Sequence, residues 1–148
     1  MKKMISMLTA LALVLSLCLI PTCSAYGREN TKVVDLGNGI TVETTTTVYD
    51  SLLRSSTQKA SSTSKFKNNG ELIATVTLTA TFGYDGSRAW VVSASGSHSM
   101  ESGWTYSNQS ISKSGGTANL TADIKSTTGL GAFPVDISLT CSKDGDIS

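Results

Sequence analysis

One stretch of alternating residues, from Leu72 to Tyr84, constrains the fold of this 148-residue chain more than any other feature. Every second residue in it is apolar, and the residues between are mostly threonine. Successive side chains of a β-strand point to opposite faces, so the pattern predicts a strand with one buried face and one face in water. Asn69-Gly70 and Asp85-Gly86 flank the stretch and are typical of hairpin turns. We therefore expect a central strand with a neighbour folded back onto each side.

Further strands are expected before and after this central strand. Lys32 to Leu36 and Ile40 to Tyr49 form a predicted hairpin. The basic segment before Gly70 has two interpretations, a mobile loop or a polar strand over about Gln58 to Lys67, and we favour the strand. An Asn-Gly turn would pair this strand with the central one so that Phe66 lies opposite Ile73. Later strands are expected over residues 88–99, 104–112, 117–125 and 135–142.

These segments together predict the fold class. Helical periodicity extends over no more than one or two turns anywhere beyond residue 25. About seven to eight short strands without helices indicate an all-β, single-domain, antiparallel two-sheet sandwich. Its general shape is expected to be immunoglobulin-like, although the Cys, Trp, Cys pattern of true immunoglobulin domains is absent.

The environment of Trp90 depends on the turn at Asp85-Gly86. A two-residue loop would pair Trp90 with Thr81 on the exposed face. A three-residue loop with a bulge would place Trp90 opposite Ala80, buried with Val92 and Ala94, because a one-residue slip reverses every side chain. We favour the buried arrangement, since it removes more apolar surface from water.

The first 25 residues have the features of a cleaved secretory signal peptide. Two lysines follow Met1, the run from Ile5 to Ile20 is almost entirely apolar, and small residues precede a cleavage site between Ala25 and Tyr26. The alternative is a surface lipoprotein acylated at Cys23, because the residues before that cysteine faintly resemble a lipobox. We therefore expect a signal peptide over residues 1–25, a flexible lead over 26–31, and one exported β-sandwich domain over 32–148.

Charge, cysteine content and composition exclude several classes of protein. Cleavage after Ala25 removes two of the twelve basic residues and none of the eleven acidic ones, which leaves a net charge of −1. A nucleic-acid partner is therefore not expected. Only Cys141 remains, so it has no internal disulfide partner, and its alternation with Ile137 and Leu139 predicts a buried thiol. Serine and threonine make up roughly three in ten mature residues, which favours antiparallel sheets with a solvated face.

The sequence contains no recognisable catalytic or metal-binding motif. His98 is the only histidine and lies among serines, but no Gly-x-Ser-x-Gly motif is present. One histidine and one cysteine do not supply the ligands of a structural zinc site. Asp144-Gly145-Asp146 resembles a fragment of a calcium loop without its final glutamate, and a polar, frayed tail is expected there. We predict a protein that is not an enzyme and uses no cofactor or metal.

Binding of an extracellular ligand is the function that the sequence favours. Flat aromatic rings beside hydroxyl and amide groups hold sugars or peptides, although the same rings also suit a sandwich core. The candidate ligand-binding residues are Tyr84, Trp90, Trp104 and Tyr106. Residues 51–70 carry basic side chains and no acidic one, which suits a weak contact with an anionic envelope surface or simply a solvated face. The candidate contacts are Arg54, Lys59, Lys65 and Lys67.

The main prediction is thus a small, secreted, non-catalytic binding protein whose ligand is a glycan, a peptide or an envelope polymer. A secreted membrane-active toxin or antimicrobial protein is the alternative, because threonine-rich alternation also suits a strand that enters a membrane. Any sheet with one buried face requires the same alternation. No transmembrane segment is expected in the mature chain, because no second long apolar run follows Ile20.

The processing site can be checked by the intact mass of the protein from culture medium and from membranes of its native host. We expect a mass that corresponds to a chain beginning at Tyr26, found in the medium. A lipid-modified chain beginning at Cys23 in the membrane fraction would contradict this prediction.

Overall fold

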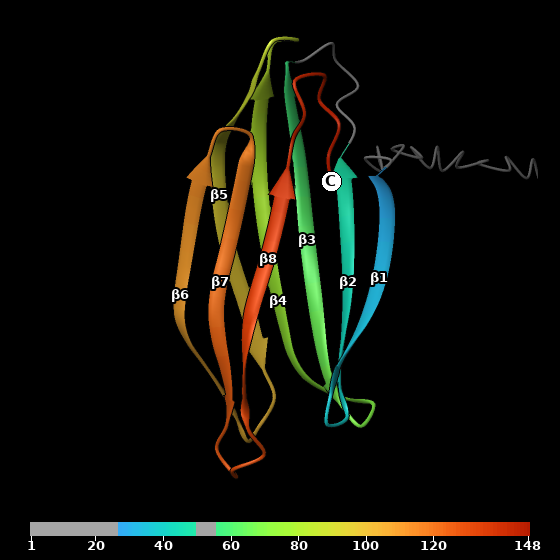
Figure 1. Ribbon diagram of the computed structural model, residues 1–148, viewed down its shortest axis with the longest axis vertical. Coiled ribbons are helices and arrows are strands. Elements are labelled where there is room, and N and C mark those ends of the chain that lie inside the picture. Colours follow the sequence, from blue (N-terminus) through green and yellow to red (C-terminus); the bar gives the residue numbers. More distant parts are fainter. Residues whose placement is uncertain (1–26, 50–55) are drawn as a thin grey trace, which may run out of the picture.

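The computed structural model describes residues 27–49 and 56–148, which form eight β-strands and no helix. The strands are β1 (Gly27–Gly37), β2 (Ile40–Tyr49), β3 (Thr57–Asn68), β4 (Glu71–Tyr84), β5 (Ala89–Met100), β6 (Trp104–Ser114), β7 (Thr117–Ser126) and β8 (Ala132–Thr140). They form a five-stranded sheet, β1-β2-β3-β4-β5, and a three-stranded sheet, β6-β7-β8, both antiparallel. The two sheets lie as separate layers (Figure 1). The prediction of an all-β sandwich is confirmed.

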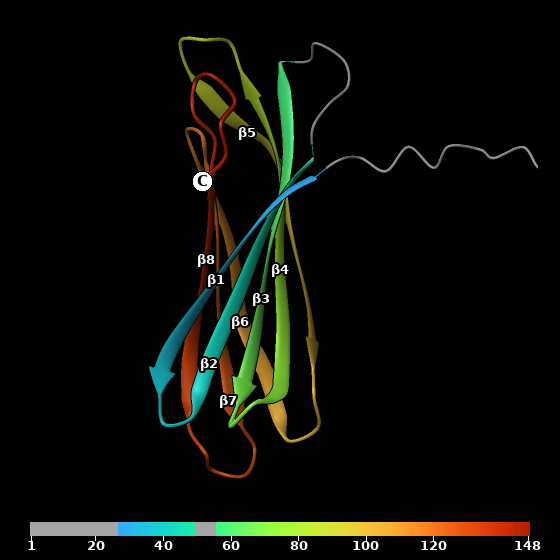
Figure 2. The same ribbon diagram turned by 90° about the vertical axis from the view of Figure 1, so that its right-hand side faces the viewer.

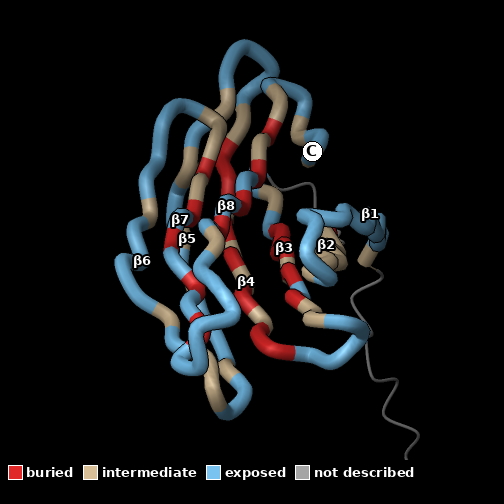
Figure 3. The backbone as a smooth tube through the Cα atoms, turned by 60° about the horizontal axis from the view of Figure 1, so that its bottom comes forward, coloured by how far each residue is buried: buried red, intermediate tan, exposed pale blue. Residues whose placement is uncertain are grey.

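One hydrophobic core lies between the two layers. Its largest fully buried side chains include Phe82 and Leu78 of β4 and Leu120 of β7. Buried residues follow β3, β4, β7 and β8, whereas β1 is exposed along nearly its whole length (Figure 3). Burial of these side chains from water stabilises the fold by roughly 1.5–3 kcal/mol for each large one. The alternating stretch is therefore the centre of the core, as its pattern predicts.

The two sides of the sandwich differ. On one side β5 lies close to β6 and β7, and at Gly96 a Cβ atom would lie only 2.5 Å from Leu120 Cδ1. Any other residue there would have to displace Leu120, so glycine allows this close approach of the two sheets. On the other side β8 packs against β3 and β4, so β1 and β2 extend past the smaller sheet. Figure 2 shows β1 and β2 twisting across this open side.

The topology is simpler than that of an immunoglobulin domain. Strand order follows chain order in both sheets, and the chain changes sheets once among the described strands, between β5 and β6. Immunoglobulin sandwiches instead contain Greek-key connections, in which a long link returns a strand beside an earlier one. The likeness to an immunoglobulin domain is therefore limited to the two packed sheets.

The β3–β4 register differs from the expected one. The Asn69-Gly70 turn is present, but Lys67 pairs with Leu72 and Phe66 pairs with Ala74, so that Ile73 is an extra residue in a bulge. The pairing of Phe66 with Ile73 was wrong for this reason. The bulge directs Phe66 into the core, where it is 3% exposed, because one inserted residue changes which side chains share a face.

The expected burial of Trp90 was also wrong. Residues 85–88 form a longer turn, and Trp90 pairs with Gly83 rather than with Ala80 or Thr81. The side chain of Trp90 is 39% exposed and that of Val92 is 53% exposed. A bulge at Val92 restores the pairing of Ala94 with Ala80, so Ala94 still packs against the core.

Both ends of the described chain have regular structure where none was expected. A flexible lead was expected over residues 26–31, of which Tyr26 lies outside the described residues. Residues 27–31 form the first half of β1 and pair with residues 45–49 of β2. At the other end, residues 142–146 form a turn closed by a hydrogen bond from the Ser142 N–H to the Asp146 carbonyl at 2.8 Å. Ile147 then pairs with Cys141, which is buried as predicted. The expectation of a frayed tail was therefore wrong.

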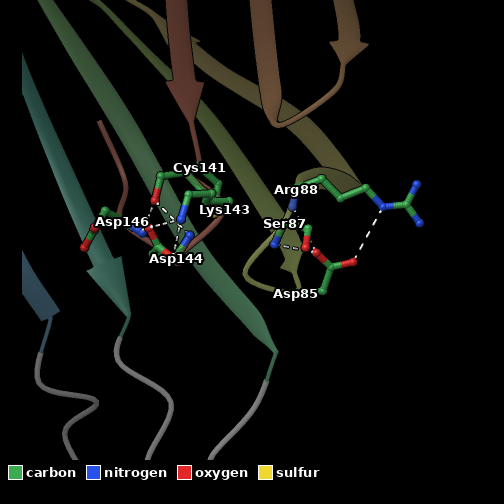
Figure 4. A network of polar contacts seen from close by, with 8 residues as sticks. Asp85, Ser87, Arg88, Cys141, Lys143, Asp144 and Asp146 are labelled. Atoms are coloured by element: carbon green, nitrogen blue, oxygen red, sulfur yellow. Dashed lines mark hydrogen bonds and ion pairs between the residues drawn. The ribbon is translucent and has the colours of Figure 1, made fainter.

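The C-terminal turn is held by the turn between β4 and β5. The Gly86 N–H donates to the Lys143 carbonyl at 2.9 Å. Figure 4 shows the two turns as neighbours, with the Asp85 carboxylate accepting the backbone N–H groups of Ser87 and Arg88. Within the described ranges, none of the backbone forms an apolar helix long enough to cross a membrane.

Replacing Leu78 by alanine should lower the free energy of unfolding by about 2–5 kcal/mol, because it opens a cavity in the centre of the core. Thr79→Ala, on the opposite face of the same strand, should cost about 0.5 kcal/mol or less. Urea denaturation of both variants checks this, and equal losses would contradict the assignment of the two faces.

Candidate functional site

The outer surface of the five-stranded sheet is an ordered array of hydroxyl groups, which we call the hydroxyl face. Its central row crosses all five strands, because cross-strand pairing aligns one hydroxyl residue from each. That row is Thr31, Thr45, Thr63, Thr77 and Ser97. A second row alongside it contains Glu29, Thr47, Ser61, Thr79 and Ser95. Alternation in β4 produces this face directly, since the apolar residues between these threonines face the core.

The hydroxyls form a regular grid that is only partly used for internal hydrogen bonds. Neighbouring strands are about 4.8 Å apart, and alternate residues along a strand are about 6.7 Å apart. Thr31 Oγ1 lies 3.0 Å from Thr45 Oγ1, and Thr63 Oγ1 lies 3.0 Å from Thr77 Oγ1. Each hydroxyl has one donor and two acceptor positions. The face therefore retains capacity to bond an outside partner.

Trp90 lies flat on this face at one end. Gly83 makes this possible, because a Cβ atom at that position would lie 2.4–2.6 Å from three atoms of the indole ring. Arg88 borders the ring, with its guanidinium carbon 5.6 Å from the ring centroid. The backbone N–H groups of Arg88 and Ser87 lower the pKa of Asp85 below its ordinary value. The turn thus presents a half-exposed ring with a cation beside it.

Tyr49 is a second ring on the same face, and the sequence analysis missed it. It is opposite Lys59 of β3, whose Nζ lies 5.6 Å from the ring centroid. The tyrosine hydroxyl lies 3.1 Å from Ser61 Oγ. The alternation of Thr45, Thr47 and Tyr49 along β2 places the three side chains on one face, because residues two apart share a face.

The three described lysines of the basic segment lie on the hydroxyl face, and Arg54 lies outside the described residues. Lys65 is opposite Glu43, and Lys67 Nζ lies 2.8 Å from Glu43 Oε2. The hydrogen bond from Lys67, together with its charge, lowers the pKa of Glu43 below its ordinary value. Part of the basic charge is thus matched within the face, which weakens the case for a purely anionic partner.

The other predicted aromatic residues are distributed elsewhere. Tyr84 lies beneath the C-terminal turn, where a Cβ atom at Gly145 would be 2.6 Å from the ring. Trp104 packs on Phe133 with ring centroids 5.9 Å apart. Tyr106 stacks on His98 at 3.8 Å, and burial raises its pKa. The structure therefore leaves Trp90 as the one candidate ring on the hydroxyl face.

His98 and Cys141, the one histidine and the one cysteine of the described residues, both pack against other side chains. His98 contacts the Tyr106 ring, and the Tyr106 hydroxyl donates to Gln109 Oε1 at 3.0 Å. In the described part of the chain, no three histidine, cysteine, aspartate or glutamate residues are placed to hold a metal ion. Burial, followed by the nearby Asp146 charge, raises the pKa of the Cys141 thiol, which disfavours the reactive thiolate.

Comparison of the chain with protein-family models, curated proteins and solved structures finds no match.

The Glu43–Lys67 pair predicts a pH dependence that NMR can measure. The pKa of Glu43 should lie below its ordinary value and should rise in Lys67→Met. Because the folded-state pKa is lowered, the pair stabilises the fold above the ordinary glutamate pKa and loses this effect as the pH falls through the lowered pKa. An unchanged Glu43 titration in Lys67→Met would contradict the assignment.

Proposed function

We propose that this chain is an exported, non-catalytic binding protein that holds a glycan chain on its hydroxyl face. One observation carries the proposal: a half-exposed Trp90 ring lies flat on Gly83 at the end of an ordered array of serine and threonine hydroxyls. Export is supported by the basic and apolar pattern of the first 25 residues. The binding role is supported by the chemistry of the face.

Sugars present two kinds of surface, and the hydroxyl face complements both. The C–H face of a sugar ring is apolar and packs on a flat aromatic ring, while its hydroxyl groups need partners that donate and accept hydrogen bonds. Trp90 supplies the first, and threonine hydroxyls such as Thr79 and Thr81 supply the second. Hydroxyls on a sheet also lose little side-chain entropy on binding, because threonine is already restricted by its branched Cβ.

The shape of the face favours a single chain over a flat crystalline surface. Strands in a sheet rotate by roughly 20–25° relative to each other, so rows of hydroxyls on five strands do not share one plane. A glycan chain follows such a twisted path. Trp90 on β5 and Tyr49 on β2 are three strand spacings apart across the sheet, about 14 Å, and two residues apart along the strands, about 6.7 Å. This separation is the length of a few sugar rings.

The charges on the face favour a neutral or weakly acidic glycan. Lys59 and Lys65 are available beside the hydroxyl rows, whereas Lys67 is bonded to Glu43. Exposed ion pairs contribute little energy, so these lysines would adjust selectivity more than affinity. The weak anionic contact expected for the basic segment thus becomes part of the same proposal.

Retention on insoluble polysaccharides and purified cell-wall material tests the proposal. Trp90→Ala should weaken retention by about tenfold, since an aromatic contact contributes on the order of 1 kcal/mol beyond the area it buries. Leu130→Ala is the matched control, because Leu130 is an exposed apolar side chain in the β7–β8 loop. Thr79→Val keeps the side-chain shape, removes one hydroxyl and should also weaken retention.

Both outcomes of this experiment are informative provided that the variants remain folded, which thermal unfolding checks. Retention lost in Trp90→Ala and kept in Leu130→Ala supports the hydroxyl face. Failure of the parent protein to bind any glycan tested, or equal retention by Trp90→Ala, would reject it.

A further inference from the structure

The open side of the sandwich contains a free strand edge. β8 is the last strand of its sheet, and β1 is the last strand of the other sheet on the same side. Backbone contacts show which N–H and carbonyl groups of β8 point to the free side. The Cys141 N–H donates to the Gly116 carbonyl, beside β7, whereas the N–H and carbonyl of Thr140 bond Ser148 and so point away from β7. Because these directions alternate in a strand, Ser138 and Asp136 also point their backbone groups to the free side.

The chain itself shows that this edge accepts another strand. Thr140 and Ser148 exchange two backbone hydrogen bonds, of 2.8 and 2.9 Å, and Ile147 pairs with Cys141 in the antiparallel sense. Ile147 also packs against the hydrophobic core. These two residues occupy the upper end of the edge as the beginning of a fourth strand, and leave the lower part, from Ser138 to Ala132, without one.

Three cavities lie on this open side, one at the end of the edge that Ile147 and Ser148 occupy and two beside its unpaired part. The first, of about 200 Å³, lies between Ile147 and the start of β1. The second, of about 240 Å³, is lined by Val34 and Leu36 on one wall and by Asp136 on the other. The third, of about 170 Å³, lies between Leu36 and Phe133. The second and third cavities share Leu36, and we call them together the groove between β8 and the overhanging β1–β2 hairpin. Figure 2 shows this hairpin crossing the open side.

The walls of the groove specify the kind of strand that fits. Residues opposite Leu139, Ile137 and Val135 would point inward, as Ile147 does. Near Val135 they would meet the partly exposed Val34 and Leu36, whereas nearer Ile147 the facing wall is polar and includes Asn30. Residues opposite Ser138 and Asp136 would point to water. Pro134 has no N–H and offers only its carbonyl to the edge. The groove therefore fits an extended peptide with apolar side chains at every second position.

We propose that this groove binds an extended segment of another polypeptide, which adds to β8 antiparallel and continues the strand begun by Ile147 and Ser148. A second copy is a poorer source of that segment. Among the described strands, those with an alternating apolar face, such as β4, β7 and β8, already bury it in their own core. β1 buries none of its residues, but its inward face is mixed, with Arg28, Asn30 and Lys32 before Val34.

A synthetic peptide tests the proposal directly. The probe is a peptide of about eight residues with valine at alternate positions and threonine or lysine between, a typical strand length; a scrambled peptide of the same composition is its control. Binding is followed by NMR of the isotopically labelled protein. The alternating peptide should slow hydrogen exchange of the Asp136 and Ser138 amides, and the scrambled peptide should not.

Two substitutions locate the site. Asp136→Pro removes an edge N–H without touching the bonds to β7 and should weaken binding by about tenfold, whereas Asp136→Ala keeps that N–H and should bind as the parent does. Leu36→Lys changes the other wall at an exposed position, 49% exposed, and should also weaken binding. This variant keeps the test decisive if Asp136→Pro does not fold.

Several results would overturn the proposal. The first is that no peptide binds at a concentration on the order of 1 mM. The second is that Leu36→Lys and Asp136→Pro leave peptide binding unchanged. The third is that the protein is a dimer without peptide and that this dimer protects the Asp136 amide from exchange. None of these results bears on the hydroxyl face, which lies on the other surface of the larger sheet.

Discussion

The alternation of side chains along β4 is the constraint on which the rest of the structure depends. One face of this strand buries Val76, Leu78 and Phe82, and the other face exposes threonines to water. Hiding the apolar set requires a second layer, which β7 and β8 supply. Presenting the threonines beside hydroxyl residues of four other strands produces the hydroxyl face. Core and candidate binding surface are thus two consequences of one pattern, and a change of register would damage both.

The unequal size of the two sheets explains the remaining surface features. Five strands in one layer and three in the other leave the inner side of β1 and β2 without a covering strand. Burying a hydroxyl group near this opening is unfavourable unless the group has a hydrogen-bond partner. Ser64 Oγ of β3 and Thr44 Oγ1 of β2 lie 2.9 Å apart and satisfy each other. The apolar residues Val34 and Leu36 remain partly exposed. An added strand beside β8 would cover them, which links the proposed peptide groove to the architecture itself.

Much of the fold could be predicted from the sequence because it follows from local rules. Alternation identified β4, the Asn38-Gly39 and Asn69-Gly70 turns identified two hairpins, and the alternation leading to Cys141 predicted its burial. The errors arose where register depends on packing. Ile73 and Val92 are the extra residues of two bulges, and the sequence around them contains no pattern that predicts either bulge. Trp90 was expected in the core because burying it with Val92 and Ala94 would remove more apolar surface from water. The sequence does not show that Gly83 leaves room for the indole ring on the outer face.

The candidate site was predicted only in part, for a related reason. Which rings share a surface depends on strand order across the sheet, and the chain alone does not show that β2 and β5 belong to one layer. Tyr49 was therefore missed, while Trp104 and Tyr106 belong to the smaller sheet. The lysines of β3 were found, but their pairing with Glu43 of β2 becomes visible only with the register known.

The most direct test of the central claim is an NMR titration of the isotopically labelled protein with soluble oligosaccharides from whichever polysaccharide retains it. If the hydroxyl face binds the glycan, the amides with the largest shifts should belong to outward-facing residues of β3, β4 and β5, including Thr79, Thr81 and Trp90. Shifts confined to the open side near Leu36 and Asp136, or to the His98–Tyr106 contact, would contradict the account.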